Sequence, residues 1–413
     1  MSISSVCKRW RSIAHSSPAI WSRISLELSA ENSRLSDVRS VLSGFLRAVE
    51  LHLHHSGEHP LTLKLDISGS IYQPVVPGPL LAFDLACNHS WCSFEMGGPY
   101  TISCIPKPRF DSIQNCRSLK NLAITVESRF SLSGILEPYS HLFPMLTNIP
   151  KTLWSSLNVN IVDDRIVDVF NYAFSPKELV LREGPECCHF TLSRPVSPQL
   201  CTSVLILKLE LHEALGYGGP LVDYAFSSFT FPSLSCLAIM TNGYHPYQGP
   251  WPEATLAAFL DRSSCSLTYF GVKRISVSDV DLIAALKLMP SLVTLRVDDT
   301  PAGDDQISPI TPRFICSLHG FLWSEQNYSS SALIPKLHEL QLTFDGLEFD
   351  DSVFINMVSS RWLPNKQHTW GVRLDCLRVV TLRFNERAVD HAVYSPLDYL
   401  EKSWDESGGS RNG

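Results

Sequence analysis

One short pattern of apolar residues recurs along this chain and constrains its fold more than any other feature. Each copy holds an apolar residue, two others, a second apolar residue, one other and a third apolar residue. Apolar residues two positions apart lie on the same side of a β-strand, because successive side chains alternate between its faces. We therefore expect a strand at every copy. The ten copies are Leu46/Val49/Leu51, Leu119/Leu122/Ile124, Trp154/Leu157/Val159, Pro176/Leu179/Leu181, Val204/Leu207/Leu209, Leu234/Leu237/Ile239, Leu267/Phe270/Val272, Leu292/Leu295/Val297, Leu337/Leu340/Leu342 and Leu377/Val380/Leu382.

The spacing of the copies indicates a repeat architecture. From Trp154 to Leu292 the first positions lie 22, 28, 30, 33 and 25 residues apart, and the last two steps are 45 and 40 residues. Leucine-rich repeats have a period of about 20–29 residues and the form L-x-x-L-x-L-x-x-N/C. The chain fits the first half of this form well and its last position poorly. That last position holds Gly184, Asn242, Thr300, Asp345 or Asn385 in the copies concerned.

A single strand of this type cannot bury its apolar side alone, whereas stacked copies bury it together. The expected fold class is therefore α/β: an irregular leucine-rich-repeat solenoid, with a curved parallel sheet and helices on its convex side. Helix signals occur between the strands, where a capping residue or a proline precedes an apolar run. They predict helices over residues 252–260, 278–289 and 350–362. Residues 301–331 are mixed in character and are expected to be rich in loops.

Composition and charge exclude several classes of protein. The 413 residues carry a net charge of −7, with a pI near 6.1, whereas nucleic-acid-binding domains are typically basic. No apolar run reaches the roughly 18 residues that indicate a membrane span, and the first residues lack the apolar core of a signal peptide. The twelve Cys include no C-x-x-C pair, which argues against a zinc ribbon. We expect a cytoplasmic or nuclear protein with no nucleic-acid or membrane partner.

No motif in the sequence indicates an enzyme. The chain contains no G-x-S-x-G, phosphate-binding loop, G-x-G-x-x-G or H-E-x-x-H sequence, so we expect no catalytic residue, metal or cofactor. His52 and His54 would share one side of the first repeat strand, with Leu51 and Leu53 on its buried side. A polar strand surface is favoured there over a metal site. The acidic pair at 298–299 is expected in a solvated turn.

The N-terminal segment predicts a short amphipathic helix. Val6, Trp10 and Ile13 lie at positions i, i+4 and i+7, which places them on one helix face. The sequence Ser16-Ser17-Pro18 is expected to end this helix. An apolar stretch typical of a strand follows over residues 19–24.

This segment resembles the second half of an F-box. The resemblance rests on Val-Cys-Lys-Arg-Trp-Arg-x-Ile-Ala, followed by Ser-Pro-x-x-Trp and an apolar strand, and covers about Ser5 to Leu28. The rest of the chain resembles the repeat-containing F-box proteins that are abundant in mushroom-forming fungi. The further stretches that carry this likeness are 60–65, 333–340, 357–362 and 377–382.

The resemblance implies docking to a Skp-type adaptor within an SCF (cullin-type) ubiquitin ligase. A full F-box opens with a Leu-Pro-x-Glu turn and a first helix that have no counterpart here, because Met1 falls in the middle of the motif. An earlier start codon would restore them. Two interpretations stay open: the retained residues contact the adaptor, or they cap the open end of the first repeat. The adaptor-binding candidates are Val6, Cys7, Trp10, Ile13, Pro18 and Trp21.

The expected surface for a target protein is the concave side of the sheet. On each strand, outward positions alternate with buried ones. The outward positions mix both charge signs with one aromatic ring, which suits a protein or peptide partner. The target-binding candidates are Lys208, Glu210, Tyr269, Lys273, Arg296, Asp298, Glu339, Gln341, Thr381 and Arg383.

The sequence thus divides into four expected parts. Residues 1–28 form a partial, helical F-box, 29–115 irregular first repeats and a connection, 116–392 the solenoid, and 393–413 a tail whose end is expected to be disordered. The predicted function is target recognition, through the repeats, by a subunit of an SCF-type ubiquitin ligase. The alternative is a leucine-rich-repeat scaffold that no longer docks the adaptor.

Overall fold

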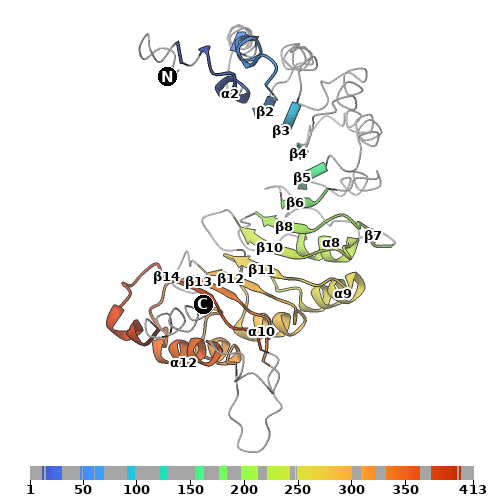
Figure 1. The fold of residues 1–413 in the computed structure, drawn as a ribbon. Helices are drawn as coiled ribbons and strands as arrows, with labels where there is room; N and C mark the ends of the chain where they lie inside the picture. The colour runs from blue at the N-terminus through green and yellow to red at the C-terminus, as the bar shows by residue number, and fades with distance from the viewer. Residues whose placement is uncertain are drawn as a thin grey trace, which may run out of the picture. The chain divides into compact units, whose positions relative to one another are not determined.

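The computed structural model describes the chain in separate segments. These are residues 12–13, 15–29, 47–48, 50–59, 61–68, 91–97, 121–127, 154–161, 176–183, 197–212, 221–241, 247, 249–299, 308–320, 332–362, 374–397 and 400. The chain divides into two compact units, Met1–Leu181 and Arg182–Gly413 (Figure 1). The boundary between the two units falls inside strand β6 (Glu178–Glu183).

The first unit contains parallel strands that pair in the order of the sequence. A short helix, α2 (Pro18–Trp21), leads directly into the first of them. Each strand pairs in parallel with the next one along the chain. The strands are β1 (Arg23–Ser29), β2 (Leu61–Ser68), β3 (Trp91–Gly97), β4 (Asn121–Glu127) and β5 (Trp154–Ile161).

The second unit repeats this arrangement with a better described set of strands. Again each strand pairs in parallel with its successor in the sheet. A separate parallel pair joins β7 (Gln199–Leu200) and β9 (Phe229–Thr230). The main strands are β8 (Ile206–Leu211), β10 (Cys236–Thr241), β11 (Tyr269–Lys273), β12 (Thr294–Asp299), β13 (Glu339–Phe344) and β14 (Val379–Phe384).

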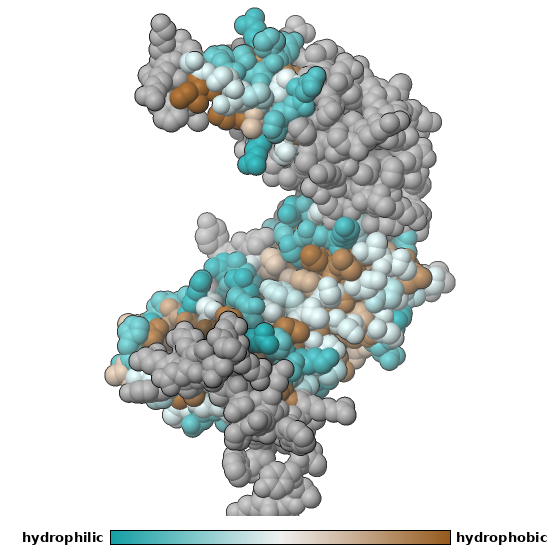
Figure 2. Space-filling model, viewed as in Figure 1, coloured by the Kyte–Doolittle hydropathy of each residue, from teal (hydrophilic) through white to brown (hydrophobic). Residues whose placement is uncertain are grey.

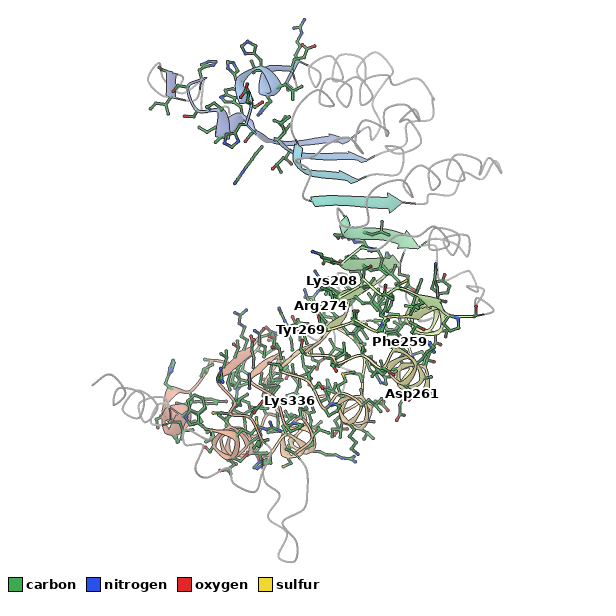
Figure 3. The ribbon with its side chains drawn as sticks, turned by 45° about the vertical axis from the view of Figure 1, so that its right-hand side comes forward. Lys208, Phe259, Asp261, Tyr269, Arg274 and Lys336 are labelled. Atoms are coloured by element: carbon green, nitrogen blue, oxygen red, sulfur yellow. The ribbon has the colours of Figure 1, made fainter. Side chains whose placement is uncertain are left out.

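Helices cover one side of the second unit's sheet (Figures 1 and 3). Successive helices contact one another along that side. Local capping explains where they begin: the side chains of Ser278, Thr311 and Asp350 each accept a hydrogen bond from an amide of the first turn. The helices are α8 (Leu221–Ser228), α9 (Glu253–Ser263), α10 (Asp279–Lys287), α11 (Pro312–Ser317) and α12 (Asp351–Arg361).

The core of the second unit is a ladder of the apolar pattern residues, aligned from strand to strand. The middle positions of the copies are direct register partners: Leu207, Leu237, Phe270, Leu295, Leu340 and Val380. All of them except Val380 are fully buried. Full burial of an aliphatic side chain is worth about 1.5–3 kcal/mol, so each copy contributes to stability only when its neighbours cover it.

The α/β class and nine of the ten predicted strands are confirmed. The three predicted helices also form, as α9, α10 and α12. The exception is the copy at residues 46–51, because residues 50–56 are helical. Leu51 is 47% exposed and Leu53 is buried, so the strand predicted there is wrong. The i, i+3 spacing of the first two pattern positions fits a helix equally well.

One further prediction needs correction, and another is tested only in part. The stretch at 19–24 does not begin as a strand, because Pro18 opens α2 and the strand starts at Arg23. The region 301–331 contains α11, whereas residues 300–307 and 321–331 lie outside the described residues. The helix expected over residues 6–14 and the tail from 401 also lie almost wholly outside them.

Candidate functional site

The side of the second unit's sheet opposite the helices, here called the open face, brings the predicted target-binding residues together. The strand register places its side chains in three rows. The first row is Ile206, Cys236, Tyr269, Thr294, Glu339 and Val379. The middle row is Lys208, Ala238, Gly271, Arg296, Gln341 and Thr381. The last row is Glu210, Met240, Lys273, Asp298, Thr343 and Arg383. All ten candidates belong to these rows.

The acids of the open face make polar contacts within it. Glu210 accepts a hydrogen bond from Arg182, with Nε and Oε2 2.6 Å apart. Glu339 accepts from the Thr294 hydroxyl at 3.3 Å and from the Gln341 amide at 2.6 Å. On the side of the second unit seen in Figure 2, hydrophilic and hydrophobic residues are interspersed. The rows of the open face hold both charge signs, an amide and one aromatic ring, which is typical of a protein-binding surface rather than of an apolar pocket.

Tyr269 is the aromatic ring of the open face and lies over a glycine. A Cβ added at Gly271 would come within 3.0 Å of the Tyr269 hydroxyl, so the ring occupies the space that a side chain would take. Burial raises the pKa of the Tyr269 hydroxyl, while the charge of Arg296 and a hydrogen bond with it oppose that rise. Figure 3 shows Lys208 and Tyr269 on the strands, with Phe259 and Asp261 on a helix behind them.

A second polar set lies at the carboxyl ends of the strands, on the helix side. Glu183 is only 7% exposed and accepts hydrogen bonds from the backbone amides of His212, at 3.1 Å, and Leu221, at the start of α8. Burial raises the pKa of Glu183 to about 7, although both amides lower it. The carboxylate thus holds the chain that follows β8.

Asp299 corrects the prediction of a solvated acidic turn. It shares the buried side of β12 with Leu295 and Val297, because all three alternate with outward positions. Burial raises the pKa of Asp299 to about 6; a hydrogen bond from Ser308 lowers it, and the charges of nearby acids raise it further. Only Asp298 of the pair faces outward.

Glu183 predicts a specific pH dependence of stability. Its pKa is higher in the folded chain (about 7) than its ordinary value of 4.5, so the folded chain binds more protons between these values. The free energy of unfolding should therefore fall by about 3 kcal/mol as the pH rises from about 4.5 to above 7. Glu183→Gln keeps an acceptor oxygen for the two amides and should remove this fall. Denaturant unfolding at pH 5, 6, 7 and 8 measures the difference.

The control for this prediction is Glu253→Gln, which changes an exposed carboxylate in the first turn of α9. The control should keep the wild-type pH profile. An unchanged profile in Glu183→Gln would show that another group, such as Asp299, causes the pH dependence.

The N-terminal segment surrounds Trp21 with imidazole rings. Trp21 is 6% exposed, and its ring centroid lies 4.7, 5.1 and 5.9 Å from those of His55, His52 and His15. His52 Nδ1 lies 3.1 Å from the Trp21 carbonyl oxygen, and His15 Nδ1 lies 3.2 Å from His55 Nε2. Burial lowers the pKa of His55, and the charges of His15, His54 and His52 lower it further.

Of the other adaptor-binding candidates, the structure describes Ile13 and Pro18, and both are exposed. Ile13 is 41% exposed, and Pro18 is exposed at the start of α2. Val6, Cys7 and Trp10 lie outside the described residues. His52 and His54 do not share a strand side, because they belong to the helix at 50–56. The helical spacing of His52 and His55, three residues apart, is the signal that would have indicated their common side.

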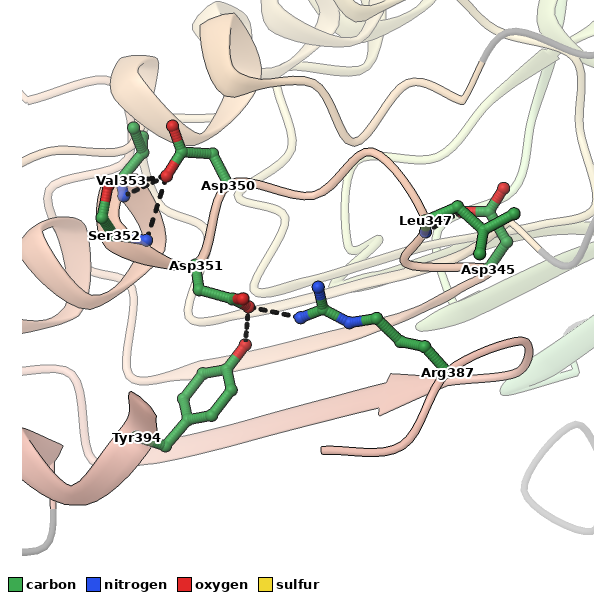
Figure 4. Close-up of polar contacts among 8 residues, drawn as sticks. All are labelled: Asp345, Leu347, Asp350, Asp351, Ser352, Val353, Arg387 and Tyr394. Atoms are coloured by element: carbon green, nitrogen blue, oxygen red, sulfur yellow. Dashed lines mark hydrogen bonds and ion pairs between the residues drawn. The ribbon is translucent and has the colours of Figure 1, made fainter. Parts of the chain in front are cut away.

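A polar cluster that the sequence analysis did not predict joins Arg387 and Tyr394, which follow β14, to Asp351 of α12 (Figure 4). The Asp351 carboxylate accepts hydrogen bonds from the Tyr394 hydroxyl and the Arg387 guanidinium. The guanidinium carbon of Arg387 also lies 4.0 Å from the Phe384 ring centroid, in a cation–π contact. These contacts cover the end of the sheet at β14.

The chain matches no protein-family model and no curated protein. Among the residues that the structure describes, no helix is both long and apolar enough to cross a membrane. The same residues contain no group of three or more His, Cys, Asp or Glu side chains arranged to hold a metal ion. The site is therefore interpreted from its own geometry.

Proposed function

We propose that this chain is a non-enzymatic substrate receptor of an SCF-type ubiquitin ligase. Its N-terminal segment would dock a Skp-type adaptor, and through it the cullin, while the open face binds a target protein. The mechanism is proximity: the receptor raises the effective concentration of the target's lysines near the charged ubiquitin carrier. No residue of the chain performs chemistry in this scheme.

The fold proposed with this function is an irregular leucine-rich-repeat solenoid. Its support is the strand order, since each strand of a unit pairs with its successor and the pattern residues align across the second unit. Helices on one side of the second unit's sheet leave the other side available to a partner. Such stacking gives the extended surfaces that repeat proteins use for binding.

One observation carries the proposal of target binding. The ten outward residues chosen from the sequence lie side by side in three aligned rows of one sheet face. Paired strands fix the backbone positions of these residues, so the partner does not have to order the main chain of the face on binding. The mixture of charges, amides and one Tyr suits a protein surface.

A second candidate function, a scaffold without adaptor docking, is favoured by the surroundings of Trp21. This side chain is buried against His52 and His55 of the helix at 50–56 instead of being presented to a partner. It also precedes β1 by two residues. Both facts suit a segment that caps the first strand of its own sheet.

Co-purification of the chain with a recombinant Skp-type adaptor tests the two functions. A receptor should retain the adaptor, and Trp10→Ala should lose it while the variant stays folded. The matched control is Leu347→Ala, which truncates a 67% exposed apolar side chain in the second unit and should keep full adaptor binding.

Absence of adaptor binding in the unaltered chain would leave the scaffold as the function. If Trp10→Ala lost both adaptor binding and a cooperative thermal transition, Trp10 would be structural, and the division of roles proposed here would be wrong.

A further inference from the structure

The charge balance of the open face is uneven once its internal contacts are considered. Of its three central acids, Glu210 is held by Arg182, and Glu339 by Thr294 and Gln341. Asp298 lies in the last row, where its register neighbours are Lys273 on β11 and Thr343 on β13, and Arg383 follows on β14. Because Arg182 neutralises Glu210, the rows keep four cations, Lys208, Lys273, Arg296 and Arg383, against the two acids Glu339 and Asp298.

Three cations extend from the same region of the face. Lys273 on β11 is half-buried, whereas Arg296 on β12 and Arg383 on β14 are exposed. Paired strands lie about 4.8 Å apart, so the three residues span about 14 Å across β11 to β14. The whole chain carries a net charge of −7, which makes this positive region differ in sign from the rest of the molecule.

The Tyr269 ring fills the floor of the face beside these cations. Ala238 and Gly271 are adjacent in the middle row, and neither carries a long side chain. Tyr269 lies flat over Gly271 next to Arg296, and offers an apolar ring with a polar end. An extended peptide would therefore pass over the Tyr269 ring while its side chains reach the cations.

We propose that the open face binds an extended, Glu- and Asp-rich segment of a partner protein, with carboxylates received by Lys273, Arg296 and Arg383. Alternate side chains of an extended peptide lie about 6.7 Å apart. This distance falls between the separation of two neighbouring strands, about 4.8 Å, and twice that separation. Guanidinium groups bind carboxylates with charge-assisted, often paired hydrogen bonds. This inference rests on the proposed function, since it names the class of target that the face selects.

The probe that tests it is a fluorescein-labelled twelve-residue peptide of alternating Glu and Ala, measured by fluorescence anisotropy with the full chain. The same peptide with Gln in place of Glu should bind at least tenfold more weakly. Binding of the Glu peptide should also weaken when NaCl rises from 50 to 300 mM, because salt screens exposed charges.

A matched pair of double variants locates the binding. Lys273→Gln with Arg296→Gln should weaken the Glu peptide at least tenfold. Lys287→Gln with Arg313→Gln also removes one Lys and one Arg, but from exposed positions of α10 and α11, and should leave binding unchanged. Thermal melting of the unaltered chain and both double variants establishes that each remains folded.

Three outcomes would overturn the inference: no binding of the Glu peptide, equal losses in both double variants, or stronger binding of a phosphoserine peptide or an RNA of equal charge. Its failure is separable from failure of the proposed function. A chain that retains the adaptor but ignores the Glu peptide refutes the acidic target alone. A chain that binds the peptide but not the adaptor refutes the ligase role alone.

Discussion

Leu295→Asp is expected to unfold the second unit. Leu295 is fully buried at the centre of β12 and pairs in register with Phe270 on one side and Leu340 on the other. The change forfeits about 2–3 kcal/mol of apolar burial. It also places a carboxylate without a partner among apolar side chains, at a cost of several kcal/mol more. Since domains are stable by only about 5–15 kcal/mol, the sum consumes most of that stability.

The control for this prediction is the next residue along the strand. Arg296→Asp introduces the same carboxylate on the open face, where water solvates it, and should shift the melting temperature by only a few degrees. Circular dichroism during heating compares the two variants. A Leu295→Asp protein that melts cooperatively near the wild-type temperature would refute the assignment of the buried side of the sheet.

The strands were predictable because their physical requirement is local. A stacked strand needs apolar residues on alternate positions, and this requirement is written directly in the sequence at copies such as Leu237 and Phe270. Strand β3 carries the same pattern at Trp91, Phe94 and Met96, although it is not among the ten copies. The pattern is therefore broader than a list of leucines.

Other elements were not predictable from the pattern, because tertiary contacts decide between two local structures. The first two positions of a copy lie three residues apart, and residues at this spacing are neighbours on a helix. The same residues can therefore belong to a helix or to the start of a strand. Residues 50–56 adopt the helix, with Leu53 buried and Leu51 exposed. His52 and His55 then lie against Trp21 from a segment about thirty residues earlier, a contact that no local spacing encodes.

The sequence predicted which residues lie on the candidate site, but not the contacts that these residues make with one another. Alternation along each strand selects the outward residues, and alignment of the copies places them in rows. The sequence does not state that Glu210 is held by Arg182, or that Tyr269 lies over Gly271. Those contacts decide which charges the face offers to a partner, so the acidic-segment inference required the structure.

Arg361→Ala is expected to destabilise the second unit by about 4 kcal/mol. Arg361 is fully buried near the end of α12. Its Nε donates to the carbonyl of Leu318, which follows α11, and its Nη1 donates to the carbonyl of Ile334 at 2.9 Å, ahead of β13. Each buried carbonyl that loses its donor costs about 1–3 kcal/mol, and the variant leaves two. One side chain thus joins three successive segments of the unit.

Burial of the guanidinium has a cost of its own, because its desolvation lowers the pKa of Arg361 to about 10. Replacing Arg361 by Ala removes this desolvation cost. That gain offsets only part of the loss, because the variant leaves two buried carbonyls without a donor and a cavity where the side chain stood. Arg361→Lys should recover part of the loss, since an ammonium donates hydrogen bonds but lacks the planar fork.

Arg378→Ala removes an exposed Arg beside β14 and should change the free energy of unfolding by less than about 0.5 kcal/mol. Urea denaturation ranks the four proteins; equal stability of Arg361→Ala and Arg378→Ala would show that the two carbonyls find other donors.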